Sequence, residues 1–134
     1  MDLELAIRAY MLSPGPLATL VGTRCYPSVL PQGVGYPAMT YQRISTIQGA
    51  TLDGPDSNES ARIQFDCYSK DKTQIHAVAK ALRVALSGFR AWIGGSPPTV
   101  NVHGTFKENE QDFYEPDEKL YRRSLDFILY FEES

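Results

Sequence analysis

The sequence lacks the basic excess that marks proteins whose main task is to grip duplex nucleic acid. It has 13 lysines and arginines against 16 aspartates and glutamates, for a net charge of -3. Because neutralised phosphates supply most of the affinity in such complexes, this charge balance argues against direct nucleic-acid binding. The dense basic pair Arg122 and Arg123 falls in an expected strand, where neighbouring side chains point to opposite faces.

Signals for membranes, export and disulfides are also missing. No apolar run reaches about 18 residues, so we expect no membrane span. The N-terminal segment MDLELAIRAYML has acids where a signal peptide has a basic region, so export by that route is not expected. Cys25 and Cys67 are far apart and form no CxxC pair, which predicts buried free thiols in a cytosolic protein rather than a disulfide.

Motifs for catalysis and for cofactors are absent as well. No serine lies in a G-x-S-x-G elbow, and neither His76 nor His103 is spaced to serve a nucleophile or a metal. The DGPD stretch at 53–56 lacks the alternating ligands and the closing glutamate of a calcium loop, so a turn is expected. Gly94-Gly95 lacks the strand-to-helix context of a phosphate cradle. We therefore predict no enzymatic activity, no metal and no cofactor.

The clearest pattern that is present lies at residues 61–86. Its first part alternates apolar and polar side chains, which predicts a strand with one dry and one wet face: Ile63, Phe65 and Cys67 against Arg62, Gln64 and Asp66. Its second part has the helical period: Ile75, Val78, Ala79, Leu82 and Leu86. Asp71 is a suitable N-cap for this helix. The two parts predict a helix that lies on one face of a sheet.

The remaining segments add elements to this unit. We expect helices at 3–12 and, for one short turn, at 17–21, and further strands at 23–26, 38–47, 99–106 and 119–131. Long loops are expected at 48–60 and 107–118, with a connection at 88–98 that carries the only tryptophan. The order α-β-β-β-α-β-β predicts a single α+β domain over 1–134. Its two layers are a mostly antiparallel sheet of about five strands and two helices packed on one face.

Several short stretches, taken together and in order, resemble one family. They are LVGTRCYP at 20–27, PQG at 31–33, YP at 36–37, YQR at 41–43, RIQFDCY at 62–68, YEP at 114–116 and YRRSLDF at 121–127. In this order and spacing the chain resembles the small tail-completion or minor tail proteins of long-tailed bacteriophages, which are similar in structure to the lambda-like tail terminator. The resemblance covers most of the chain and implies the same α+β fold.

The resemblance implies a structural virion protein without catalytic residues. Family members form rings, typically of six subunits, at the head-proximal end of the tail tube, where they stop tube growth and offer a surface to the head. Implied partners are further copies in a hexameric ring, the major tail tube protein and the head-tail connector proteins. DNA would only pass through the lumen, without sequence-specific binding. The protein would be present in the host cytoplasm during assembly and then in the virion tail.

A ring requires that one patch of a subunit meet a different patch on its neighbour. We expect the polar loop, the wet sheet face and the Tyr114 corner to make contacts with neighbouring subunits or with the tube. The candidate residues are Gly49, Leu52, Asp53, Asp56, Asn58, Arg62, Gln64, Asp66, Tyr114, Glu115, Asp117 and Arg122. The acidic residues of 107–118 are expected to be a solvated loop or, in a ring, a negative band that repels DNA.

Two alternatives remain open from the sequence. The first is a head-tail joining (neck) protein or another minor tail component, because these share the small fold. The second belongs to a different class: a small-molecule-binding or enzymatic α+β domain with a pocket between helix and sheet, whose candidate chemistry would come from His76, His103 and Cys67.

Overall fold

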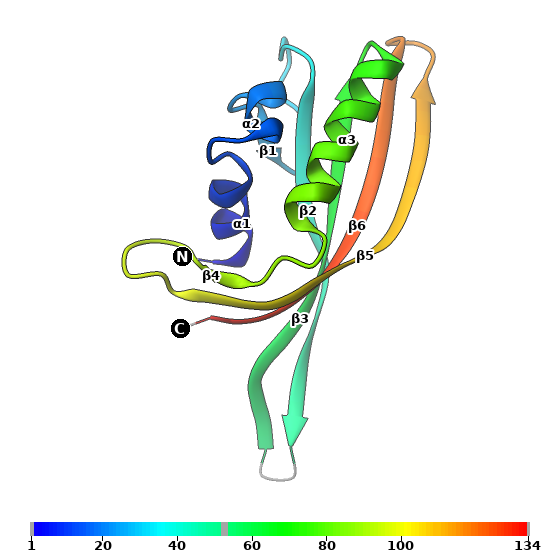
Figure 1. Ribbon diagram of the computed structural model, residues 1–134. Helices are drawn as coiled ribbons and strands as arrows, with labels where there is room; N and C mark the ends of the chain where they lie inside the picture. Colours follow the sequence, from blue (N-terminus) through cyan, green and yellow to red (C-terminus); the bar gives the residue numbers. More distant parts are fainter. Residues whose placement is uncertain (1, 52–53, 134) are drawn as a thin grey trace.

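Three helices cover one face of a six-stranded sheet in the computed structural model of the protein, which describes residues 2–51 and 54–133 and, within these, side chains outside 48–58 (Figure 1). The elements are α1 (Leu3–Met11), α2 (Pro16–Val21), β1 (Cys25–Pro27), β2 (Ala38–Thr51), β3 (Gly54–Ser69), α3 (Lys72–Leu86), β4 (Ala91–Ile93), β5 (Val100–Glu115) and β6 (Leu120–Glu133). The predicted α+β class with two layers is confirmed.

The sheet is built from two long antiparallel hairpins that lie side by side. Strand β2 pairs with β3, β5 pairs with β6, and β3 joins the hairpins by pairing antiparallel with β6. Short strands complete the two edges, so that the order is β1-β2-β3-β6-β5-β4. Strand β1 runs parallel to β2, and β4 pairs only with the first residues of β5. The predicted, mostly antiparallel sheet is therefore confirmed, with β4 as an additional strand.

The core lies between this sheet and the helices. The alternating residues of β3 that were predicted to be dry, Ile63, Phe65 and Cys67, are fully buried. The apolar stripe of α3 is buried against them, as its helical period predicts. Asp71 caps α3: its Oδ1 accepts a hydrogen bond of 2.9 Å from the backbone N–H of Thr73. The predicted turn at 17–21 is α2, which buries Leu17 and Val21.

The prediction of a loop at 48–60 is wrong for the described residues of this stretch, 48–51 and 54–60. The backbone there continues the β2–β3 hairpin, with Gln48 opposite Glu59 and Ala50 opposite Pro55. This part of the hairpin extends as an arm beyond the rest of the fold (Figure 1). An arm without a core beside it needs no apolar alternation, because its backbone ladder supplies the hydrogen bonds that define the strands. The sequence signal for a strand was therefore missing.

The loop predicted at 107–118 is wrong up to Glu115, because β5 continues to that residue in register with β6, whereas residues 116–119 form the turn between the two strands. Three acids in this stretch have a base as partner: Glu110 pairs with Arg83, Asp112 with Arg123 and Glu115 with Arg122. Asp112 lies directly opposite Arg123 in the ladder, and Arg123 Nε donates to Asp112 Oδ1 at 2.5 Å. Opposite charges at facing positions stabilise paired strands, which outweighs the low strand propensity of the acids.

Candidate functional site

The sheet face that turns away from the helices carries a cluster of polar side chains. On β3 these are Arg62, Gln64 and Asp66, which alternate with buried core residues. The register of β6 places Ser124 opposite Asp66 and Asp126 opposite Gln64. We call this surface the outer face. The β3 residues predicted from the alternation thus do lie together on one face.

Ion pairs cross the outer face between β3 and β6. Arg62 Nη2 donates to Asp126 Oδ2 at 2.6 Å, and this hydrogen bond raises the pKa of Arg62 above its ordinary value. Arg122 Nη1 lies 3.8 Å from Asp66 Oδ2, and Arg122 Nε lies 3.7 Å from Glu115 Oε1. Four residues of the predicted interface, Arg62, Asp66, Glu115 and Arg122, therefore belong to one charged cluster.

Four polar atoms of this cluster are buried and form no hydrogen bond with the described part of the chain: Asp66 Oδ1, Arg122 Nε, Ser124 Oγ and Asp126 Oδ1. Asp126 is only 7% exposed and Ser124 only 5%. A buried polar group without a partner costs about 1–3 kcal/mol. Because these atoms are already covered by the chain itself, their missing hydrogen bonds are a cost to the fold and do not present groups to a partner.

Aromatic side chains frame the polar cluster. Phe113 stacks under Arg122, with the guanidinium carbon 4.2 Å from the ring centroid. Phe106 meets Tyr130 edge to face at 5.9 Å, and both rings are about half exposed. Exposed aromatic residues are enriched at protein interfaces. The outward Phe113 was missed because 107–118 was predicted to be a loop, and Phe106, the last residue of the predicted strand 99–106, was not assigned to a face.

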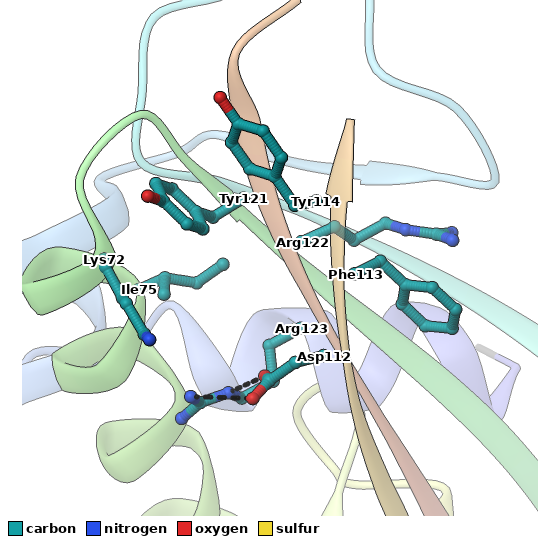
Figure 2. A pocket seen from close by; sticks show the side chains of 8 residues that line it. All are labelled: Lys72, Ile75, Asp112, Phe113, Tyr114, Tyr121, Arg122 and Arg123. Atoms are coloured by element: carbon teal, nitrogen blue, oxygen red, sulfur yellow. Dashed lines mark hydrogen bonds and ion pairs between the residues drawn. The ribbon is translucent and has the colours of Figure 1, made fainter. Parts of the chain in front are cut away.

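The predicted Tyr114 corner divides between the two faces of the sheet. Figure 2 shows Arg122 and Phe113 on one side of the β5–β6 hairpin, and Tyr121, Arg123 and Lys72 on the other. Tyr114 contacts Tyr121 with 4.8 Å between ring centroids. Asp117 is exposed in the turn that follows β5.

A cavity of about 220 Å³ lies between α3 and this end of the sheet. Its lining is shown in Figure 2: Lys72, Ile75, Asp112, Phe113, Tyr114, Tyr121, Arg122 and Arg123. Small-molecule sites usually measure about 300–1,000 Å³, so this cavity is small for such a ligand. None of the three residues proposed to supply chemistry, His76, His103 and Cys67, lines this cavity.

On the helix side of the sheet, charged side chains connect α3 with β5 and β6. Arg123, besides its bond to Asp112, places Nη1 at 3.1 Å from His76 Nδ1, which can accept the hydrogen bond when the ring is neutral. Arg83 Nη1 donates to Glu110 Oε2 at 2.9 Å. His76 thus belongs to a packing contact. Because Glu110 and Asp112 are paired, they contribute less to the predicted negative band than free carboxylates would.

Both cysteines are free and buried, as predicted. Burial raises the pKa of Cys25 from 9.0 to about 11 and raises the pKa of Cys67 still further. The described residues contain no group of three or more histidines, cysteines or acids placed to hold a metal ion. Within the same described part, no helix is long and apolar enough to cross a membrane.

The thiols are expected to resist Ellman's reagent in the folded protein at pH 8 and to react completely in denaturant. The reagent needs an accessible thiolate, and burial removes both the access and the charge. Because the pKa is raised on folding, the protonated thiols stabilise the fold fully below pH 9, and this contribution falls as the pH rises toward about 11. Rapid reaction of either thiol without denaturant would contradict the burial.

The remaining predicted interface residues belong to the hairpin arm. Gly49 belongs to β2, and Asp56 and Asn58 belong to β3, at the register shift between the pairs Gln48–Glu59 and Ala50–Pro55. The structure does not describe the side chains at these three positions. Leu52 and Asp53 lie outside the described residues. The role of these five positions stays a prediction.

Comparison with solved structures finds the same fold in a chain of a structure titled "Virion of native gene transfer agent (GTA) particle". The TM-score is 0.79 at 17% sequence identity, and the match covers 97% of this chain and 94% of the other. At this identity the likeness concerns the fold. Among curated proteins, none matches the chain.

Residues 6–132 match the model of the family described as "Tail completion protein gp17". The chain therefore belongs to the tail completion protein gp17 family, and it is a structural protein of the bacteriophage tail. The resemblance inferred from the ordered sequence stretches is thereby confirmed.

Proposed function

We propose that the protein caps the head-proximal end of the phage tail tube as a hexameric ring and provides the surface that joins the tail to the head. The observation that carries this proposal is the family match over residues 6–132. The outer face supports it, since its exposed aromatic residues favour a contact with another protein. The proposed site is therefore an interface, and the proposal assigns no catalytic step to it.

The hairpin arm is the second surface that suits this function. It projects away from the body of the fold, where it can reach the tube or a neighbouring subunit (Figure 1). Gly49, Leu52, Asp53, Asp56 and Asn58 would make these contacts, while the outer face would contact another copy. DNA would pass through the lumen without sequence-specific contacts, which suits the net charge of -3. The ring would form in the host cytoplasm and remain in the virion.

The test is co-sedimentation of the purified protein with tail tubes, followed by electron microscopy of the tube ends. We expect binding at one end of each tube and a ring of six copies there. No association with tubes at any concentration would refute the capping function. Binding to isolated head connectors with no binding to tubes would instead assign the protein to the neck.

A shortened arm provides a matched variant. Ile47 lies opposite Ser60, so residues 48–59 can be replaced by an Asn-Gly turn that keeps the register of the remaining hairpin. The variant should retain the fold by circular dichroism, because the core residues lie outside the arm. Its affinity for tubes should fall, and unchanged affinity would remove the arm from the proposed contact.

A further inference from the structure

We propose that Trp92 on the outer face of one copy inserts into a groove on the helix side of a second copy. The receiving surface, here called the α1–α3 groove, lies between the last turns of these helices and is lined mainly by Tyr10, Met11, Leu17, Ala81, Val84 and Ala85. This inference rests on the proposed ring, because it concerns contacts between copies. It goes further by naming the two surfaces and the chemistry that joins them.

The α1–α3 groove is apolar and large enough for an aromatic ring. None of the described residues that line it carries a charge, and its volume is about 270 Å³. A buried apolar cavity of about 150 Å³ already holds a benzene molecule. Val84, at the rim of the groove, is 72% exposed. Covering this apolar surface with an aromatic side chain would remove both from water, which favours association.

Trp92 is an exposed apolar side chain on the other side of the sheet. It lies opposite Asn101 in β5, and Asn101 lies opposite Glu132 in β6. Phe131, the neighbour of Glu132, is fully buried under the helices, so Glu132 and Trp92 share the outer face. The Trp92 side chain is 55% exposed. Because β4 is the edge strand of the sheet, this ring lies where it can meet another molecule.

Two further aromatic rings extend the apolar surface beside Trp92. Tyr130 lies opposite Gly104, in the row of the sheet next to that of Trp92. A Cβ at Gly104 would lie 3.1 Å from Cε2 of Phe106, so the Phe106 ring leans over the glycine. There it meets Tyr130 edge to face. These rings would pack on the rim of the α1–α3 groove once Trp92 is inserted.

The contact has to join two copies, because the sheet separates Trp92 from the groove within one chain. The helices α1 and α3 cover one face of the sheet, whereas Trp92 belongs to the outer face (Figure 1). Two different surfaces of one subunit give a head-to-tail contact, which a ring requires. A contact between the Trp92 side chains of two copies would use one surface twice and would end at a dimer.

The charges beside the two surfaces are complementary. The helix α3 contains no acid, and its exposed Lys80 lies one turn before Val84. Glu132 lies about 10 Å from Trp92, two strand spacings along the same row, so it can approach Lys80 when Trp92 lies beside Val84. Arg90 is exposed two residues before Trp92 and would meet the C-terminal ends of α1 and α3, whose helix dipoles favour a cation.

The contact is expected to be weak between two free copies. A buried aromatic side chain covers about 150–250 Å², so the exposed half of Trp92 supplies on the order of 100 Å². A stable interface buries about 800 Å² on each partner. In a ring every copy is held on two sides, which compensates for a weak single contact. Association therefore has to be measured both in solution and on tail tubes.

The first experiment follows the fluorescence of Trp92, the only tryptophan of the chain, over a concentration series of the full chain. Self-association should shift its emission to shorter wavelengths and protect it from iodide, because the ring leaves water. Val84→Asp puts a charge at the rim of the groove and should weaken association at least about 10-fold. Trp92→Ala, followed by analytical ultracentrifugation, should weaken it to a similar extent.

Phe113→Ala is the matched control for the loss of Trp92. It removes an exposed aromatic side chain from the same face, about 40 Å further along β5 than Asn101, and should associate like the wild type. Circular dichroism checks that each variant remains folded. We expect this because Trp92 and Val84 are mostly exposed and substitutions at such positions are usually near neutral.

Crosslinking in solution and on tail tubes tests which surfaces meet. Asn101→Cys places a thiol beside Trp92, Val84→Cys places one at the groove, and the native thiols are buried. A mixture of these variants treated with a short bismaleimide should give crosslinked dimers, whereas each variant alone should not. Thr73→Cys replaces Val84→Cys as the control. It lies on the same side of α3 but three turns away, about 16 Å, and should give no crosslink.

The outcomes separate this inference from the proposed function. If rings form on tubes without the crosslink, or if Trp92→Ala and Val84→Asp assemble like the wild type, the named contact is wrong while tube capping stands. If copies crosslink in solution but never bind tubes, the contact stands and tube capping is wrong. If Trp92→Ala loses tube binding and no crosslink forms, Trp92 belongs to the contact with the tube and the inference is overturned. Wild-type copies that associate in neither setting would also overturn it.

Discussion

Replacing Phe127 with alanine is expected to lower the free energy of unfolding by about 3–5 kcal/mol, the usual cost of removing a fully buried phenylalanine. Phe127 is 0% exposed and lies at the seam where β3 and β6 join the two hairpins. Its ring meets Phe65 edge to face, with 5.8 Å between centroids. The substitution would lose this contact and leave a cavity beneath the helices.

Urea denaturation followed by circular dichroism would measure the effect. Phe106→Ala is the matched control, because it removes the same side chain from a position that is 58% exposed. The control should change the free energy of unfolding by less than about 1 kcal/mol, since surface substitutions are usually near neutral. Similar losses for the two variants would show that the seam is not the centre of the core.

Replacing Gly94 with alanine is expected to destabilise the fold by about 2–3 kcal/mol for two reasons that add. Gly94 has φ of +88°, which L side chains rarely adopt. A Cβ at this position would also lie 3.1 Å from the Cβ of Ala6, a buried residue of α1. Because Ala6 is fixed by its helix, the contact can be relieved only by moving α1 or the turn after β4.

Gly33→Ala separates the two reasons. Gly33 also has a positive φ, +76°, but a Cβ there would meet nothing within 4 Å. This control should cost only about 1–2 kcal/mol, the price of the backbone conformation alone. Thermal unfolding of both variants gives the comparison. Equal losses would show that the contact with Ala6 is relieved without cost.

The sequence predicts those helices and strands whose own pattern of apolar residues shows which side is buried. Residues 61–86 are the clearest case. The alternation of apolar and polar residues in β3 and the apolar stripe of α3 each indicate which side packs against the core. The arm and the second half of β5 have no such apolar pattern. Their strands depend on pairing with another segment, through the backbone ladder or through facing charges such as Asp112 and Arg123.

The candidate site was predictable only in part for a related reason. Alternation shows that Arg62, Gln64 and Asp66 share a wet face, which the structure bears out. That Ser124 and Asp126 are buried on this face depends on neighbours from adjacent strands, which no local pattern reveals.

The two-hairpin construction has a consequence for the order in which the chain folds. Each hairpin joins strands that are close in sequence, so its loop closes quickly, whereas the β3–β6 seam pairs residues such as Ile63 and Phe127 from distant parts of the chain. Contacts between distant segments slow folding, because chain entropy is lost before they form. The rate-limiting step is therefore expected to be the docking of the hairpins along this seam. Interfaces on the outer face, which spans β3 and β6, would become available only after that step.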